Sequence, residues 1–331
     1  MDPVTHTLAG VTLGNAFFRK KAGRAAVPIM VLASNLPDID AIVHLTGDPT
    51  AVMLRRTFGH SLFLLPLWCL ACAWVLRRFW PAIRNGPMLG MIGLGVAVHL
   101  FFDLINSFGV VVLWPFWGAR PELAWVFIID FALTGILALP LLLSLAPRLR
   151  PRIAMMSRAA LATVACYLAL CGFLHHRALQ LLERTEGMAG SASAGSAVRS
   201  EPAEPLPDDD WVEVESHETP DFFYVFPEPL GPHRWRGVAR VEDTYHLYVL
   251  HPLTGQVERR RSVVTRIGDP RVAAARATPF GRRVEWFFKA PVWEVGRDGR
   301  SAEAWDLRFK PLVVEREAVF RFTVPAPGAG R

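Results

Sequence analysis

Apolar runs dominate the first half of the chain, and polar residues gather in the short segments between them. Several runs are shorter than the roughly 20 residues of a comfortable membrane span, so we expect tilting or snorkelling of flanking arginines to compensate. The pattern predicts a mainly α polytopic membrane domain of five or six helices. The runs cover residues 4–18, 25–45, 61–76, 88–113, 123–146 and 159–174.

The pattern changes after residue 176, where the long apolar runs end. Residues 187–207 are rich in Gly, Ala, Ser, Pro and Glu, a composition typical of flexible linkers. From Trp211 onward, short alternating or aromatic segments such as WVEVES, HLYVL and AVFRFTV are separated by turn signals, which is typical of strands. We therefore predict a membrane-embedded domain (1–180), a flexible linker (181–208) and a small β-rich soluble domain (209–331).

The charge distribution predicts how the membrane domain is oriented. The chain carries 36 Lys and Arg against 30 Asp and Glu, a net charge of +6. Much of this excess flanks apolar runs, where basic residues favour the cytoplasmic side, so we do not expect nucleic-acid binding. Assigning the basic loops 19–24, 77–84 and 148–158 to the cytoplasm gives a consistent alternation. The N-terminus and the β-rich domain then lie outside the cytoplasm.

His99 and Asp103 are the only titratable side chains between Met88 and Ala119, inside an apolar run long enough to cross a membrane. Four residues apart on a helix, they project from one face, where an imidazole and a carboxylate can meet the same metal ion. An unpaired ionisable group at that depth costs several kcal/mol, so a partner, an ion or water must compensate it. A hydrogen bond between helices is the alternative interpretation of this pair.

The predicted topology brings further histidines and aspartates to the same level. Asp38 and Asp40 follow Pro37, which disfavours a continuous helix, so we expect them on a broken helix or a loop. The whole set exceeds the needs of one tetrahedral ion, so it predicts one or two divalent ions, zinc being the expected metal. The predicted metal ligands are His6, Asp38, Asp40, His60, His99, Asp103 and Asp130.

Other polar residues near this set have two interpretations each. Asp38 and Asp40 are the candidate catalytic residues, as ligands or as the base that takes a proton from water, although either can instead cap the following helix. Arg55 and Arg56 are candidates for binding a substrate phosphate through bidentate contacts, or form an interfacial arginine pair. We expect Asn106 and Ser107, one turn past Asp103, to orient the ligands or to hydrogen-bond between helices.

Several motifs in order resemble the bacterial inner-membrane metal-dependent hydrolases of the YdjM-like family. They are MDPVTHTLAG, SNLPDIDAI, RRTFGHSL, HLFFDLINSFG, VLWPFW and WVFIIDF, within residues 1–175. Their order of His, Asp, His and His-x-x-x-Asp is also similar to part of the metal set of zinc-dependent phospholipase C and P1-type nucleases. That similarity implies metal contacts for His6, Asp38 or Asp40, His60, His99 and Asp103. The chain has no convincing downstream His plus His-x-x-x-Glu for a third zinc, and Asp130 is the substitute ligand.

These observations predict a metal-dependent hydrolase of the bacterial inner membrane with a periplasmic β-rich domain. A divalent ion would activate water to attack an ester bond, most simply a phosphoester, of an amphiphilic or lipid substrate. The lipid bilayer and this substrate are the expected partners. A divalent-metal transporter or sensor is an alternative, because buried His and Asp sets also mark ion pathways. A non-catalytic membrane scaffold is another.

Overall fold

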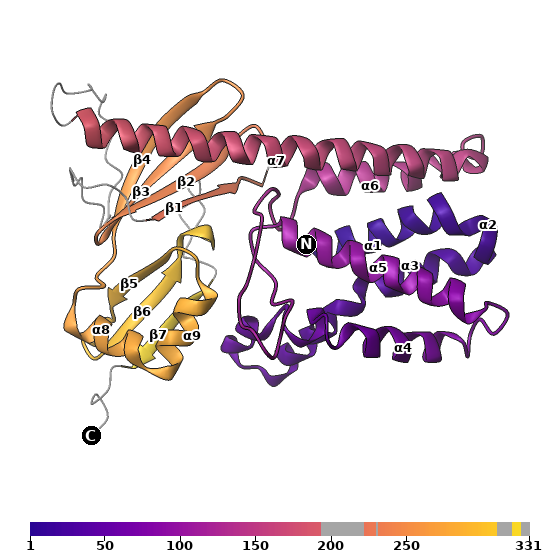
Figure 1. The fold of residues 1–331 in the computed structure, drawn as a ribbon, viewed down its shortest axis with the longest axis horizontal. Coiled ribbons are helices and arrows are strands. Elements are labelled where there is room, and N and C mark those ends of the chain that lie inside the picture. The colour runs from indigo at the N-terminus through magenta and orange to yellow at the C-terminus, as the bar shows by residue number, and fades with distance from the viewer. Residues whose placement is uncertain (193–221, 230, 310–319, 326–331) are drawn as a thin grey trace. The chain divides into compact units, whose positions relative to one another are not determined.

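The computed structural model describes residues 1–192, 222–229, 231–309 and 320–325, and it forms two compact units (Figure 1). The first unit holds residues 1–173 together with the short segment 227–232. The second unit holds residues 174–226 and 233–331. The first unit is mainly helical, and the described strands belong to the second unit except for Pro227 at the end of the first strand, so each unit is described separately below.

The first unit begins with a helical hairpin. Helix α1 (Pro3–Leu13) starts at Asp2, whose side chain accepts hydrogen bonds from the first free backbone N–H groups. It continues through a π-helical turn, Gly14–Phe18, into the short α2 (Arg19–Ala22). Gly23 then adopts a φ of 58°, a left-handed conformation that glycine tolerates, and the chain reverses into α3 (Ala26–Asn35).

Two glycines allow the arms of this hairpin to lie in close contact. A Cβ atom at Gly10 would lie 2.7 Å from the carbonyl oxygen of Met30, and one at Gly14 would lie 3.0 Å from the Cα of Val27. The spacing of four residues places Gly10 of α1 and Gly14, which directly follows α1, on one helical face. This is the small-residue pattern by which membrane helices approach one another closely.

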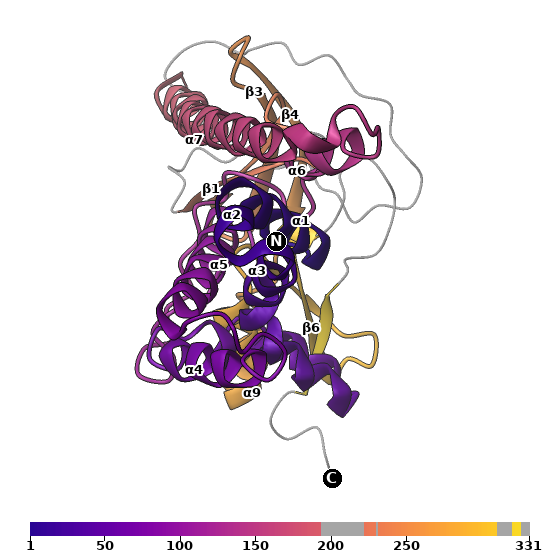
Figure 2. The same ribbon diagram turned by 90° about the vertical axis from the view of Figure 1, so that its right-hand side faces the viewer.

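After α3 the chain forms short 3-10 segments before it returns to long helices. These are η3 (Leu36–Thr46), η4 (Pro49–Leu54) and η5 (Phe58–His60). Figure 2, viewed nearly along the bundle, shows α3 packed between α1 and α5. The longer helices that follow are α4 (Leu65–Leu76), α5 (Asn85–Ile105), α6 (Phe131–Leu143) and α7 (Ile153–Ala192).

Several helical runs of the described chain are long and apolar enough to cross a membrane. Among the described residues, three helical runs meet this condition: Pro3–Thr46, Asn85–Ile105 and Arg150–Gly187. A fourth is obtained if Pro49–His60 and Leu65–Leu76, which bend by 77°, form one broken span, and α6 is a shorter apolar helix. The first of these runs contains the hairpin of α1 and α3. The prediction of a polytopic helical part is confirmed.

The basic turns gather at one end of the helical bundle. The turn at α2, the connection from α4 to α5 and the connection from α6 to α7 lie together at the right of Figure 1. These are the segments to which the basic clusters 19–24, 77–84 and 148–158 belong. The start of α1 and the end of α5 lie at the opposite end of the bundle.

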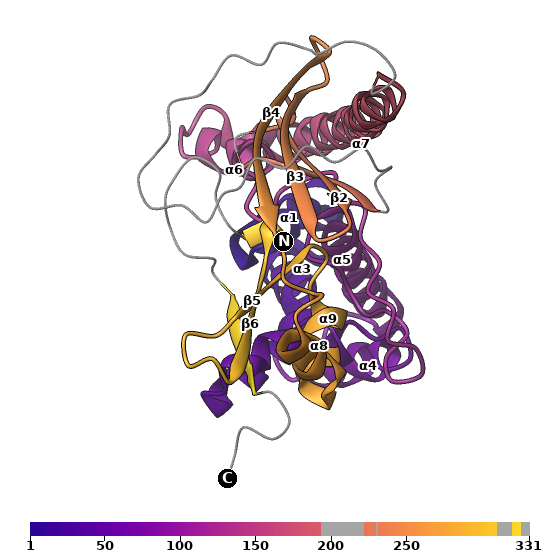
Figure 3. The ribbon, with the colours of Figure 1, turned by 90° about the vertical axis from the view of Figure 1, so that its left-hand side faces the viewer.

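The second unit contains two antiparallel sheets, seen from another side in Figure 3. The first sheet has the order β1-β2-β3-β4, and the second has the order β5-β6-β7 and packs with the short helices α8 (Pro270–Ala277) and α9 (Pro279–Phe287). The prediction of a β-rich C-terminal part is confirmed. The strands are β1 (Phe222–Pro227), β2 (Trp235–Val241), β3 (Thr244–His251), β4 (Gln256–Val264), β5 (Pro291–Val295), β6 (Ser301–Asp306) and β7 (Arg321–Pro325).

The C-terminal half of α7 covers the first sheet. Leu174, Ala178 and Leu182 are fully buried and share a core with Trp235 and Leu250. This burial stabilises α7 beyond residue 180, and the helix runs to Ala192, so residues 181–192 are helical where we expected the start of a flexible linker. The rest of that expected linker lies outside the described residues. The boundaries at 180 and 208 stay predictions.

Candidate metal centre

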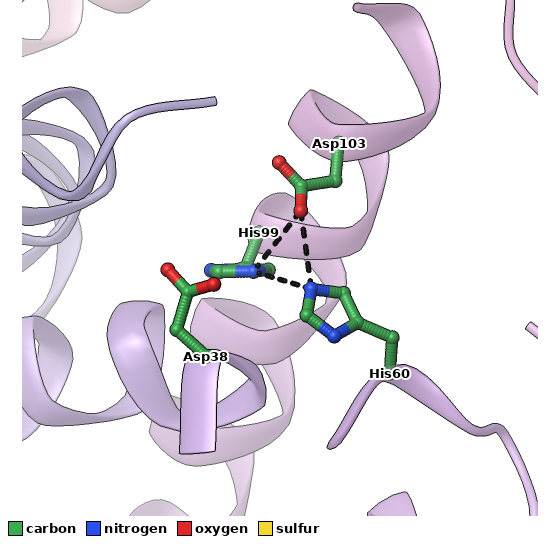
Figure 4. Close-up of side chains that lie close together, drawn as sticks. All are labelled: Asp38, His60, His99 and Asp103. Atoms are coloured by element: carbon green, nitrogen blue, oxygen red, sulfur yellow. Dashed lines mark hydrogen bonds and ion pairs between the residues drawn. The ribbon is translucent and has the colours of Figure 1, made fainter. Parts of the chain in front are cut away.

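Four side chains from three separate elements converge at one end of the helical unit (Figure 4). Asp38 comes from η3, His60 from η5, and His99 and Asp103 from consecutive turns of α5. One potential ligand atom from each lies within 4.8 Å of all the others. Three of the residues are completely buried and Asp38 is half-buried. The two residues singled out in the apolar run thus belong to a group that could hold a metal ion.

The hydrogen bonds around the two central histidines determine which ring nitrogen carries a proton. Nδ1 of His99 lies 2.7 Å from the carbonyl oxygen of Ser34, so this nitrogen donates. Nδ1 of His60 lies 2.8 Å from Oδ2 of Asp40 and donates to that carboxylate. Both Nε2 atoms are then unprotonated lone-pair donors in the neutral rings. Metal-ligating histidines have this arrangement, because the second ring nitrogen fixes the tautomer and the ring orientation.

The two Nε2 atoms face one another at 3.1 Å, and Oδ2 of Asp103 lies 3.1 Å from the first and 3.6 Å from the second. With both rings neutral, neither nitrogen can donate a hydrogen bond to the other, so the contact is repulsive unless a cation lies between them. A proton or a divalent ion would remove this repulsion. Imidazole nitrogen and carboxylate oxygen are the ligands that zinc and similar ions prefer.

Buried acceptor atoms around the group also favour an ion. Nδ1 of His6, Oδ2 of Asp38 and Oδ1 of Asp40 are buried and have no hydrogen-bond partner within the described part of the chain. Such atoms are rare in folded proteins, and an ion or a water molecule that they bind is a common explanation. The donor set therefore fits a divalent metal.

Local sequence features position the ligands that precede α5. Helix α3 ends at Asn35, and Pro37 begins the 3-10 segment η3, which carries Asp38 in its first turn. The expectation that the two aspartates lie on a broken helix is confirmed. Gly59 packs tightly against this segment, because a Cβ there would lie 2.1 Å from the carbonyl oxygen of Pro37. The absence of a side chain at Gly59 lets the turn that carries His60 approach Asp40.

Both arginines proposed to bind substrate form ion pairs with carboxylates of the site. Arg55 lies 2.8 Å from Oδ1 of Asp38 and 3.5 Å from Oδ1 of Asp40. Nε of Arg56 lies 2.8 Å from Oδ2 of Asp103, and its NH1 group donates to Asn106. Arg56 has a φ of 59°, an uncommon conformation for a residue with a side chain. Such strain is often stored at functional sites, and here it accompanies a buried guanidinium aimed at the cluster.

His6 of α1 joins the group from another side. Its Nε2 lies 3.2 Å from Oδ1 of Asp103, and its ring stacks on that of His99 with 3.7 Å between centroids. The amino nitrogen of Met1 contacts the same oxygen of Asp103. Asp103 is therefore shared, with Oδ1 facing His6 and Oδ2 facing His60 and His99. This arrangement gives His6 a place at the edge of the four-residue group.

The structure places the remaining predicted residues around or apart from the group. Asn106 donates to Asp103 at 3.4 Å and accepts from Arg56, which agrees with an orienting role, and Ser107 is buried beside it. Asp130 has other contacts: it accepts from the backbone of Leu133 at the start of α6 and from the hydroxyl of Tyr167, each at 2.8 Å. It does not join the four residues, and its role as a ligand stays a prediction.

Two groups of the site escaped the sequence interpretation. The carbonyl of Ser34 orients His99, and the backbone N–H of Thr57 donates to Oδ2 of Asp40 at 3.1 Å. Backbone groups carry no residue-type signal, so no pattern of side chains could have identified them. The contact of Asp40 with His60 depends on how η3 and η5 pack, and the spacing of 20 residues does not predict it.

The contact between Asp40 and His60 leads to a testable expectation. In Asp40→Asn, an amide of similar shape replaces the carboxylate, which weakens the hold on the Nδ1 proton and lowers the basicity of Nε2. We expect the affinity for a divalent metal to fall by about 10- to 100-fold. Titration of the purified, metal-stripped protein with zinc against a competing chelator measures the change. Asp48→Asn, on an exposed aspartate near the same segment, is the control and should bind as wild type does. An unchanged affinity in Asp40→Asn would contradict the orienting role.

Comparison with known proteins finds a family match over the helical part of the chain. Residues 1–178 match the YdjM inner membrane protein family, which covers more than half of the chain and contains all four residues of the group. The chain belongs to the YdjM family. It is accordingly an inner membrane protein, and the resemblance noted from the motifs is confirmed for the family.

A protein of Bacillus subtilis (strain 168) is also similar to this chain. The chain is 29% identical over 123 residues to the uncharacterized protein YfhP, a match that covers 35% of this chain and 38% of YfhP. The chain thus matches well under half of that relative's length. No solved structure matches the chain.

Proposed function

We propose that this YdjM-family protein is a membrane-bound, metal-dependent hydrolase that cleaves an ester bond, a phosphoester in the simplest case, of an amphiphilic or lipid substrate. The observation that carries the proposal is the convergence of imidazole nitrogens of His60 and His99 with the carboxylates of Asp38 and Asp103. A bound divalent ion, with zinc as the expected metal and one or two ions per chain, supplies Lewis acidity and a water that ionises near neutral pH.

The residues around the group have different roles in this proposal. His60, His99 and Asp103 would hold the ion, while Asp40 is already engaged with His60 and with the backbone of Thr57. Asp40 therefore positions a ligand. Asp38 keeps one oxygen without a hydrogen-bond partner in the described residues, and it is the group available to bind the ion or to accept a proton from the attacking water.

Arg55 and Arg56 supply positive charge beside the site. Each already pairs with a site carboxylate, so together they neutralise part of the negative charge that a phosphate group would meet. A guanidinium has five donors, and one carboxylate contact leaves others for a phosphoryl oxygen. These arginines would bind the substrate headgroup and stabilise charge that develops during the reaction.

Exposed aromatic side chains next to the site favour an amphiphilic substrate. Phe63 follows His60 by three residues, is 55% exposed, and contacts the ring of Phe116 at 4.9 Å between centroids. Phe116 and Trp117 are 78% and 63% exposed. Aromatic residues of this kind favour the membrane interface, where the headgroup of a lipid is found.

The orientation of the protein in the membrane is also a proposal. The basic turns lie at the opposite end of the helical unit from the His/Asp group, and basic residues favour the cytoplasmic side. The group and the β-rich domain would then face the periplasm. A reporter fused after Leu206 should be active only in a periplasmic form, and activity of a cytoplasmic reporter at this position would contradict the orientation.

Hydrolysis by the purified full chain tests the function. We expect turnover of one member of a panel of phosphoester and carboxyester lipids that depends on added metal and is lost on chelation. His99→Ala should lower the rate by at least about 100-fold, because the group that organises the reaction loses a ligand. His176→Ala, on an exposed histidine of α7, is the matched control and should retain wild-type turnover. Metal binding without turnover of any ester, together with metal uptake into vesicles, would contradict the hydrolase and favour a transporter.

A further inference from the structure

A second site candidate lies on the helical unit, at the end that carries the basic turns. Here α1 and its continuation meet the connection between α6 and α7 around a cavity of about 430 Å³. This volume falls within the range of about 300–1,000 Å³ that is common for small-ligand pockets. Four basic residues line the cavity, together with apolar side chains that include Phe17 and Ile153; the basic residues are Arg19, Lys20, Arg150 and Arg158.

Hydrogen bonds to the π-helical turn Gly14–Phe18 hold two of these basic side chains in position. Arg158 donates from Nε to the carbonyl oxygen of Ala16 at 2.9 Å, which links α7 to this turn. Arg19 donates to the side chain of Asn15, also at 2.9 Å, and Asn15 is buried. Both guanidiniums have further donors beyond these contacts. They are therefore oriented before any ligand arrives, which lowers the entropic cost of binding.

The charge of the cavity is not neutralised from within the described residues. No acidic side chain lines it, and none of the four basic residues forms an ion pair in the part of the chain that the structure describes. The apolar lining favours a ligand that has an apolar part beside its charged group over a purely hydrophilic one. A basic recess with apolar walls, placed at the end of membrane helices, has the chemistry that binds anionic lipid headgroups.

We propose that this cavity binds the phosphate-bearing headgroup of an anionic phospholipid such as phosphatidylglycerol, with the glycerol and upper acyl chains against Phe17 and Ile153. The arginines and Lys20 would contact the phosphate through charge-assisted hydrogen bonds. This site is separate from the His/Asp group, which is built at the opposite end of the helices. Bound lipid would fasten α7 to α1 at their basic ends and anchor the bundle in that leaflet.

Native mass spectrometry of the full chain in detergent tests the proposal. Dioctanoyl-phosphatidylglycerol is titrated against dioctanoyl-phosphatidylcholine, with wild type and the double variant Lys20→Ala, Arg150→Ala. Neither replaced side chain makes a hydrogen bond within the described residues, so this variant should fold. We expect wild type to prefer phosphatidylglycerol, and the double variant to lose about 30-fold in affinity, since each basic group near an anionic lipid contributes about five- to sixfold.

The control is Arg77→Ala, Arg78→Ala, two exposed arginines at the same end of the bundle but outside the cavity. It should bind phosphatidylglycerol as wild type does. An equal loss in this control, or equal binding of phosphatidylcholine by wild type, would overturn the site. A third arm adds inorganic phosphate. Displacement of the lipid by phosphate at similar concentration would show a free-anion site and overturn the lipid assignment.

Discussion

Removal of either central histidine should abolish stoichiometric metal binding. In His60→Ala or His99→Ala, one of the two facing imidazole ligands is lost, and a single imidazole remains in the group with the carboxylates of Asp38 and Asp103. Loss of an orienting partner alone weakens metal binding by about 10- to 100-fold, so loss of a direct ligand should exceed about 100-fold. Elemental analysis of protein purified at equal metal exposure measures the content per chain.

His44→Ala is the matched control, because His44 lies on η3 close in sequence to Asp40 and its side chain is exposed. This variant should keep the metal content of the wild type. His6→Ala addresses the number of ions: if His6 serves a second ion, its removal halves the content and leaves one ion on the other residues. Wild-type metal content in His60→Ala or His99→Ala would contradict the role of these histidines as metal ligands.

Replacement of Asp103 should cause the largest loss of stability among the site variants. Asp103 is completely buried and pairs with Arg56, which is 5% exposed, so Asp103→Leu leaves a buried guanidinium without its carboxylate. Breaking a buried ion pair by removing one partner costs about 3–5 kcal/mol. Reversible unfolding of the metal-free protein in mixed micelles should therefore show a loss of this order.

The double variant Arg56→Met, Asp103→Leu separates this effect from the loss of packing. With both charges of this pair replaced by apolar side chains, Arg56 no longer leaves a buried guanidinium unpaired, and pairs replaced in this way are often neutral in stability. The amino group of Met1, which also contacts Asp103, loses its partner equally in the single and the double variant. We expect the double variant to recover most of the stability that Asp103→Leu loses. If the double variant is as unstable as the single one, the ion pair is not the source of the cost.

The sequence alone determined the class of the fold and identified the His and Asp residues of the buried group. Apolar runs of near-membrane length are expected to form helices, because in lipid the backbone groups of such a segment must be hydrogen-bonded within the segment. The segments after residue 220 were predicted as strands on different grounds: their polar and apolar or aromatic residues alternate, which is the period of a strand. His99 and Asp103 could be recognised because an ionisable side chain in such a run requires compensation, and their spacing of four fixes a common face.

Tertiary structure alone decided which of the candidate residues meet. Asp38 and Asp40 are two residues apart, yet Asp38 offers an oxygen to the central group and Asp40 binds Nδ1 of His60. That difference depends on the 3-10 geometry of η3 and on the close approach of Gly59 to Pro37, which residue types do not encode individually. Asp130 shares the residue type of the ligands, but its contacts are with Tyr167 and the start of α6.

The roles of Arg55 and Arg56 also show the difference between what the sequence suggested and what the tertiary structure decided. Their position beside a predicted site suggested contact with substrate, and the structure shows that each also neutralises a buried or half-buried carboxylate. Helix α7 is another case in which packing decided the outcome. Residues 181–192 continue a helix whose preceding turns pack on a sheet, where the composition had suggested a linker. Local sequence determines what each segment can form. Long-range packing selects among those possibilities, because the burial of a few side chains contributes more free energy than local preference does.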